Sequence, residues 1–290
     1  IYLMRLADNI DPERTNISAP NIHKKILAHG FENDLVGRIL LLAKVLFDKT
    51  HLGPDFDCDS AKSAAFEATK LLLDMRDIHA LLSAEIHSIM EKGLLPDTGR
   101  SQNIPTVNDL ETHIKTYVHK VDQVRDIVIG LFKLVYGAGK SKKILEHIKD
   151  TIVAKHGANS DLDQFFDQIK PVLEFTRNLR NGVEHPKPDY RLIILDFNPT
   201  AAATVTPPTV ELVHADTPQP KMLVTSFMEQ MNDQFTGIVE WLIVNLCLSN
   251  MGHFGGFECG IMELPAERRR HKGTRFSYAV RLNDQWQPLG

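Results

Sequence analysis

The chain has 290 residues, of which 43% are hydrophobic and 24% are charged, and its formal net charge is −4 at pH 7. This composition is typical of a globular protein and argues against extended disorder. The negative net charge also argues against broad, sequence-independent binding of nucleic acid. Any contact with RNA therefore has to come from a local basic patch.

Three cysteines, Cys58, Cys247 and Cys259, are too few and too widely spaced for a disulfide framework. Free thiols in a reducing cytosol are the simplest interpretation, so we expect a cytoplasmic protein. The first residues are too charged for a signal peptide. The most apolar run, residues 238–248, holds a glutamate and an asparagine, which predicts a buried core helix and not a membrane span.

Apolar residues at helical spacing predict five helices in the first two thirds of the chain. They cover residues 33–51, 61–95, 107–136, 142–155 and a segment from about 161 to 185. Asp59 or Ser60 is expected to cap the second helix, and the pair His156-Gly157 to end the fourth. Pro171 predicts a kink or a break in the fifth helix, because its ring removes a hydrogen bond of the helix interior.

The pattern changes after the fifth helix. Residues 190–197 and 210–215 look like two strands and predict a hairpin with a long Pro/Ala/Thr-rich loop. A helix follows over 223–250, and two further strands are expected at 257–264 and 276–282. The predicted fold is mainly α, an antiparallel helical bundle with a small β appendage after the fifth helix and at the C-terminus.

Two local patterns resemble ligand sites without their defining spacing. YGAGKSKK at 136–143 lacks the first glycine of a phosphate-binding loop and follows a helix, so it predicts a helix end and a basic turn. Cys247, His253 and Cys259 are spaced more widely than the ligand pairs of zinc sites, so we expect no metal. Four histidines on helices are interpreted as surface or satisfied core residues: His79, His87, His113 and His119.

The densest positive cluster is ERRRHKGTR, residues 267–275. Two interpretations stay open for it. It is either a solvated turn between two strands or a phosphate-contact patch that offsets the acidic average. In the second interpretation Arg268, Arg269 and Arg270 bind substrate.

The stretch TRNLRNGVEHP, residues 176–186, ends the fifth helix with an unusual group of polar side chains. On a helical wheel Arg177, Asn181 and His185 form a polar stripe, and Arg180 lies between this stripe and the core face. The core face is predicted from five apolar residues: Phe165, Ile169, Val172, Leu179 and Val183.

Arg180 and His185 are about 140° apart on an ideal helix, so they do not meet within one straight helix. Gly182 is expected to loosen the backbone between them, or a second chain supplies the complementary group. A purely structural interpretation also exists. Cationic side chains favour a helix C-terminus, and Arg180 with Glu184 makes a surface pair one turn apart.

The residues RNGVEH at 180–185 resemble the motif of the HEPN superfamily, an arginine followed by a polar residue and, a few positions later, a histidine. By motif and helix order the resemblance covers residues 107–250, with the hairpin 190–215 inserted. Residues 1–106 are then an N-terminal helical region and residues 251–290 a C-terminal β/basic extension. The hairpin and both flanking regions depart from the minimal HEPN bundle.

This resemblance implies an endoribonuclease that needs neither metal nor cofactor, with its site at a homodimer interface. The 2′-hydroxyl of RNA would attack the adjacent phosphate, with His185 as general acid or base. Arg180 would hold the phosphate, Asn181 would orient it or the imidazole, and Arg177 would add a substrate contact. Toxin-type or phage-defence cleavage with an antitoxin partner fits the family. The alternative is a non-catalytic HEPN-like module for RNA, a nucleotide or a protein partner, which the net charge and Glu184 favour.

Overall fold

The computed structural model describes residues 1–92, 103–137, 143–200, 204–252, 256–271 and 273–289. Within these ranges the chain forms seven α-helices and one π-helical turn. They are α1 (Ala7–Ile10), the π-helix η1 (Val36–Leu41), α2 (Leu42–Leu46), α3 (Cys58–Lys92), α4 (Leu110–Tyr136), α5 (Ile144–His156), α6 (Asp161–Glu184) and α7 (Val224–Ser249).

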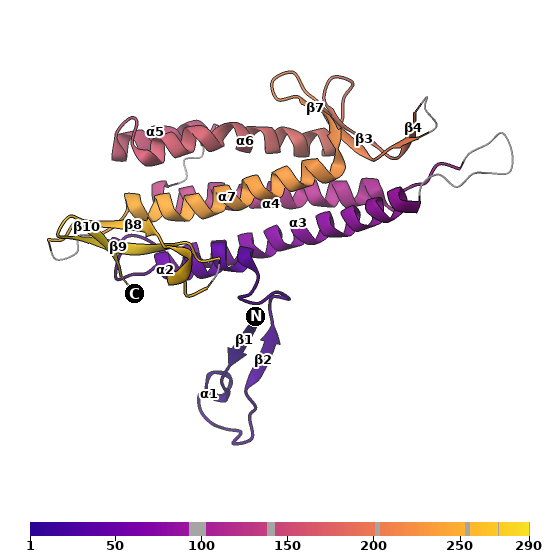
Figure 1. The fold of residues 1–290 in the computed structure, drawn as a ribbon. Coiled ribbons are helices and arrows are strands. Elements are labelled where there is room, and N and C mark those ends of the chain that lie inside the picture. The colour runs from indigo at the N-terminus through magenta and orange to yellow at the C-terminus, as the bar shows by residue number, and fades with distance from the viewer. Residues whose placement is uncertain (93–102, 138–142, 201–203, 253–255, 272, 290) are drawn as a thin grey trace.

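The long helices α3, α4, α6 and α7 lie alongside one another and form the body of the molecule (Figure 1). The chain passes along α3, returns along α4, passes out again along α6 and returns along α7, so sequential long helices are antiparallel. The short helix α5 packs on α4 and α6. The expectation of a mainly α protein with antiparallel helices is confirmed.

The strands form small antiparallel sheets at the edges of this helical body (Figure 1). Three strands cover the C-terminal end of α6 in the order β3-β6-β7, and three strands at the opposite end have the order β10-β9-β8. The bounds are β1 (Tyr2–Arg5), β2 (Ile22–Lys25), β3 (Arg191–Leu195), β4 (Asn198–Pro199), β5 (Val205–Thr206), β6 (Thr209–Val213), β7 (Gln219–Leu223), β8 (Cys259–Glu263), β9 (Phe276–Leu282) and β10 (Gln285–Pro288), with a 3-10 turn η2 (Ala266–Arg268) after β8.

The hairpin predicted after the fifth helix is confirmed, because β3 pairs antiparallel with β6. The sequence patterns missed β7, which extends this sheet, and β10, which pairs with β9. They also missed β1 and β2, a hairpin whose residues are all exposed and which projects away from the body (Figure 1). These strands bury little apolar surface, so no regular alternation marks them in the sequence.

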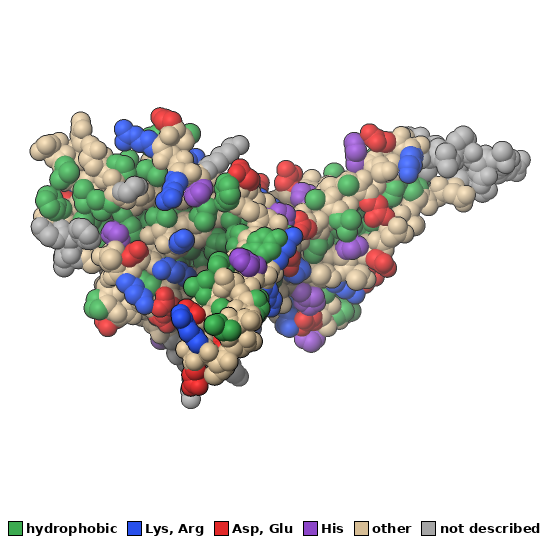
Figure 2. Space-filling model, turned by 90° about the horizontal axis from the view of Figure 1, so that it is seen from below, with side chains coloured by type: hydrophobic (Ala, Val, Ile, Leu, Met, Phe, Trp, Pro, Cys, Tyr) green, Lys and Arg blue, Asp and Glu red, His purple; other side chains and the backbone are tan. Residues whose placement is uncertain are grey.

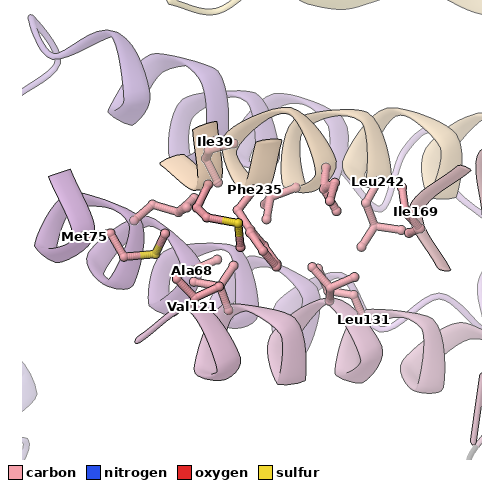
Figure 3. Packing of buried hydrophobic residues seen from close by; sticks show 14 of the residues in the cluster. Ile39, Ala68, Met75, Val121, Leu131, Ile169, Phe235 and Leu242 are labelled. Atoms are coloured by element: carbon pink, nitrogen blue, oxygen red, sulfur yellow. The ribbon is translucent and has the colours of Figure 1, made fainter. Parts of the chain in front are cut away.

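The core is one continuous cluster of buried apolar side chains that runs from Leu27 to Tyr278. Figure 3 shows its centre, where side chains of η1, α3, α4, α6 and α7 meet. Residues 238–248 lie in α7 and are buried except for Trp241 and Leu248, so the predicted core helix is confirmed. Among the described helices, none combines the length and the apolarity that crossing a bilayer demands.

The predicted cap of α3 is wrong, and the break that was one of the two outcomes expected at Pro171 does not occur. Asp57 and not Asp59 or Ser60 caps α3, because its carboxylate accepts a hydrogen bond from the backbone N–H of Ser60 at 3.0 Å. Helix α6 also runs through Pro171 as one element. A proline in a helix interior costs about 3 kcal/mol.

The burial around Pro171 explains why α6 is not broken there. Phe166 and Ile169 before it and Leu173 after it are all buried. Each such side chain contributes about 2 kcal/mol when it leaves water, which outweighs the cost of the proline. The buried face also differs from the predicted one, since Phe165 and Val172 are only half-buried. Helix α6 packs against α4, α5 and α7 at once, and this packing turns its core face toward Phe166 and Leu173.

A buried carboxylate links the two ends of the chain to the helical body. Glu240 of α7 is fully buried and accepts hydrogen bonds from two guanidinium groups. Arg38 of η1 reaches Oε2 at 2.7 Å, and Arg275 reaches Oε1 at 2.9 Å and Oε2 at 2.7 Å. Both arginines are partly exposed, so Glu240 alone bears the full cost of leaving water.

Glu240→Gln is expected to lower the free energy of unfolding by about 3 kcal/mol, because the neutral amide removes the buried counter-charge that Arg38 and Arg275 share. Urea denaturation followed by circular dichroism measures this change. Asp59→Asn is the control, since it breaks the exposed pair with Lys49 and should leave the midpoint nearly unchanged. Equal midpoints for both variants would contradict the structural role of Glu240.

Candidate functional site at the C-terminal end of α6

The RNGVEH segment ends α6 as predicted. Glu184 is the last helical residue, and His185 follows with φ −131° while its backbone N–H still donates to the carbonyl of Asn181 at 2.8 Å. Pro186 then prevents continuation of the helix. A tight turn in which Lys187 and Tyr190 exchange backbone hydrogen bonds leads into β3. The imidazole of His185 is therefore held at a helix end and is 72% exposed.

Gly182 has a different role from the predicted one. It lies inside the unbroken helix, so it does not open the backbone between Arg180 and His185. A Cβ at this position would lie 3.0 Å from Leu212 of β6 and 3.3 Å from the backbone nitrogen of Leu192 in β3. The missing side chain lets the three-stranded sheet approach the end of α6.

Arg180 is held by two carboxylates. Its Nη2 lies 2.5 Å from Oε2 of Glu184, and its Nε lies 3.8 Å from Oδ2 of Asp122 in α4. Its Nη1 also donates to Oδ1 of Asn181 at 3.4 Å, a long hydrogen bond. The predicted surface pair between Arg180 and Glu184 is thus present, and α4 adds a second acidic partner.

Helix α4 carries a further arginine and a further aspartate beside this contact. Arg125 contacts Asp122 at 3.3 Å and Asp126 at 2.8 Å, and it donates to the carbonyl of Leu173 in α6 at 2.9 Å. Asp122 is largely buried, and this burial raises the pKa of its carboxyl above the ordinary value. The negative charge of Asp126 raises that pKa further, whereas Arg125 and Arg180 lower it.

Two imidazoles face the same glutamate. His185 Nε2 lies 3.9 Å from Oε2 of Glu184, and His119 Nδ1 of α4 lies 3.6 Å from Oε1. The glutamate side chain is only 27% exposed, and His119 is 44% exposed. Glu184 therefore lies at the centre of the group, in contact with Arg180 and between both histidines. Its carboxylate links the end of α6 to His119 of α4.

We name this group the charge cluster. Its members come from the middle of α4 and the end of α6, and they are His119, Asp122, Arg125, Asp126, Arg180, Glu184 and His185. With neutral imidazoles, two guanidinium groups face three carboxylates, so the cluster carries one net negative charge. Protonation of both imidazoles would change that balance to one net positive charge. The cluster as seen in one chain therefore attracts an anion only when imidazoles are protonated or carboxylates are removed.

A groove of about 380 Å³ adjoins the cluster. Gly182, Val183 and Pro186 form one side of it, and β3 forms the other. Two cationic side chains line it, Arg191 of β3 and Lys115 of α4, the latter one helical turn before His119. Lys115 is paired with Glu111 at 2.6 Å, so Arg191 is the more available cation.

Of the other residues predicted to bind substrate, Arg177 lies near the C-terminal end of α6 and Arg268–Arg270 lie far from it. Arg177 is exposed one turn before Asn181 on the same helix. Arg268, Arg269 and Arg270 instead follow β8, at the opposite end of the helical body (Figure 1). Arg269 is bound to the Leu264 carbonyl and to Glu263, whereas Arg268 and Arg270 are exposed. One chain does not bring this arginine run to the RNGVEH segment.

Acidic and basic side chains are interspersed on the face drawn in Figure 2, so this face carries no broad basic surface. This agrees with the negative net charge. Contact with a nucleic acid would need a few well-placed cations such as Arg180 and Arg191.

The two patterns rejected from the sequence lie only partly within the described residues. Cys247 is buried and its thiol contacts the carbonyl of Leu46 at 3.5 Å, so it behaves as a core residue. His253 and residues 138–142 lie outside the described residues. Among the residues that are described, no three His, Cys, Asp or Glu side chains group as metal ligands would.

Comparisons with protein-family models, with curated protein sequences and with solved structures found no match. The resemblance to the HEPN superfamily therefore depends on the RNGVEH segment and the order of the helices, and it stays a prediction. His119, Asp122 and Arg125 were not recognised as site residues from the sequence. Their spacing on α4 places them on a shared side of that helix, but only the packing of α4 on α6 brings them to Arg180.

Glu184→Gln is expected to raise the affinity for pyrophosphate about threefold, because it removes the carboxylate closest to Arg180, a contact worth less than about 1 kcal/mol at this exposure. Isothermal titration calorimetry at low salt measures the change. The matched control is Glu174→Gln on the same helix, which removes one negative charge beside Lys170. If both variants gain equally, net charge and not the release of Arg180 explains the result.

Proposed function

We propose that the chain is a HEPN-type, metal-independent endoribonuclease of the cytoplasm that acts as a homodimer. The observation that supports this most is the common location of Arg180, Asn181 and His185 at one helix end. There the imidazole is open to solvent and the guanidinium is 37% exposed, next to a groove with a free cationic edge. These are groups of the kind that RNA transesterification uses, and they lie together at the C-terminal end of α6.

In the proposed reaction the 2′-oxygen of RNA forms a bond to the adjacent phosphorus and the bond from phosphorus to the 5′-oxygen breaks. One group removes the proton of the 2′-hydroxyl, and another donates a proton to the leaving 5′-oxygen. His185 performs one of these transfers. Arg180 binds the non-bridging phosphate oxygens, where negative charge develops, and Asn181 orients the phosphate or the imidazole. The products carry a 2′,3′-cyclic phosphate and a 5′-hydroxyl.

The groove next to the cluster suits the nucleotide that flanks the cleaved bond. Its walls are apolar at Val183 and Pro186, which suits the face of a base, and Arg191 offers a cation for the next phosphate. Arg177 extends the cationic side chains along α6. In a homodimer, the second copy would bring another Arg180 and His185 to the same place.

A second candidate function follows from a specific observation. In one chain Arg180 is already paired with Glu184 and Asp122, and the cluster carries a net negative charge. Such a site suits a basic partner better than RNA, in agreement with a non-catalytic HEPN-like module that binds a protein partner such as an antitoxin. The two candidate functions differ in whether the purified protein cuts RNA on its own.

The purified protein is expected to cut a structured RNA in the presence of EDTA and to leave 2′,3′-cyclic phosphate ends. His185→Ala and Arg180→Ala should each lower the cleavage rate by about 100-fold or more, since each removes a proton-transfer or charge-stabilising group. Denaturing gels and mass spectrometry of the products provide the measurement. His87→Ala is the control, because it removes an exposed imidazole of α3. Cleavage that survives both substitutions, or that requires Mg²⁺, rules out the proposed mechanism.

The dimer is tested by light scattering coupled to size-exclusion chromatography. A homodimer should appear at micromolar concentration, and mixing inactive His185→Ala with inactive Arg180→Ala protein should restore part of the activity if one site uses groups from both copies. A strictly monomeric protein with full activity would refute the interface and leave the chemistry intact.

A further inference from the structure

His119 is the second imidazole of the charge cluster, and the motif at 180–185 does not include it. It lies on α4, some sixty residues before the motif, and reaches Glu184 Oε1 at 3.6 Å. His185 approaches the other oxygen of the same carboxylate. Both imidazoles are partly open to solvent, so both can meet a substrate that enters the cluster.

Transesterification of RNA needs two proton transfers, one from the 2′-hydroxyl and one to the 5′-oxygen. Imidazole suits both, because it exchanges a proton near neutral pH. A single histidine can perform only one of them at a time. The other has to come from a second group close to the same phosphate.

On the basis of the proposed function, we infer that His119 is a catalytic residue and supplies the second proton transfer. One imidazole starts neutral and takes the proton of the 2′-hydroxyl. The other starts protonated and gives its proton to the leaving 5′-oxygen as the bond to phosphorus breaks. The pair ends with its protonation exchanged and its total charge unchanged, and water-driven opening of the cyclic phosphate can return it to the starting state.

Glu184 explains how the two histidines act together. Its carboxylate contacts His119 through one oxygen and His185 through the other, so both imidazoles are held beside the same negative charge. With one imidazole protonated, the cluster has no net charge and no longer repels an incoming phosphate.

The groups that face the two histidines come from two packed elements. Glu184 of α6 contacts both imidazoles, while the other charged members of the cluster are Arg180 of α6 and Asp122, Arg125 and Asp126 of α4. The remaining members of the cluster are carboxylates and guanidinium groups, side chains that in general transfer protons less readily near neutral pH than imidazole does. Asp122 has a raised pKa, but its side chain is only 18% exposed and is already engaged by Arg125. His119 is therefore the better proton-transfer group.

The inference predicts the shape of the pH–rate profile. Wild-type protein should show a bell-shaped profile for cleavage of a short fluorescent oligoribonucleotide, since one imidazole must be neutral and the other charged. His119→Ala should lower the maximal rate by about 100-fold and leave a profile with one limb. His119→Gln should do the same, because glutamine keeps hydrogen-bonding capacity without transferring protons near neutral pH.

His113→Ala is the matched control, since it removes a half-buried imidazole from the same helix. Thermal unfolding shows whether each variant folds, and His119→Gln guards against loss of activity through loss of packing. A wild type that cuts RNA while both His119 variants keep its rate and its bell-shaped profile overturns the assignment of His119 alone. A wild type that cuts no RNA overturns the proposed function and the assignment together.

Discussion

The buried carboxylate of Glu240 is the contact on which the arrangement of the helices depends. It ties η1, α7 and the segment before β9 together through Arg38 and Arg275, residues that lie hundreds of positions apart in sequence. A fully buried ion costs several kcal/mol to desolvate, and only paired donors on both oxygens offset that cost. The close approach of Gly37 and Gly273 occurs beside it, where an added Cβ would lie 2.7 Å from the facing backbone. Together these contacts join η1, α7 and the segment before β9.

The orientation of α7 determines what lies at the end of α6. Helix α7 begins directly after β7, so the sheet β3-β6-β7 has to lie beside the first turn of α7. The same sheet covers Gly182 and forms one wall of the groove next to the charge cluster. Helix α4 packs against both α6 and α7, which sets the distance between His119 and Glu184. The candidate site thus depends on long-range packing, although its motif is local.

This dependence explains what could be predicted from the sequence. The long helices, the strand Phe276–Leu282 and the end of α6 follow from periodicity and from local stop signals, and they are present. The positions of Arg180, Asn181 and His185 on one helix end follow from the same local rules. The pairing of Arg180 with Asp122 does not, because it needs the register between α4 and α6. The distance between Arg268–Arg270 and the RNGVEH segment could not be predicted either. It depends on the tertiary structure, because the sequence of a basic run does not tell at which end of the helical body the run lies.

The contacts of Arg180 in one chain are compatible with either proposed function. The free energies of its ion pair and of its possible hydrogen bonds to phosphate show why. An ion pair as exposed as Arg180–Glu184 contributes at most about 1 kcal/mol. A hydrogen bond from a guanidinium to a charged phosphate oxygen contributes about 1.5–3 kcal/mol, and a guanidinium can make two of them. A phosphate placed within reach can therefore displace Glu184 from Arg180. Under the proposed function, the same residue that neutralises Arg180 in the free protein would remain beside the two histidines once RNA is bound.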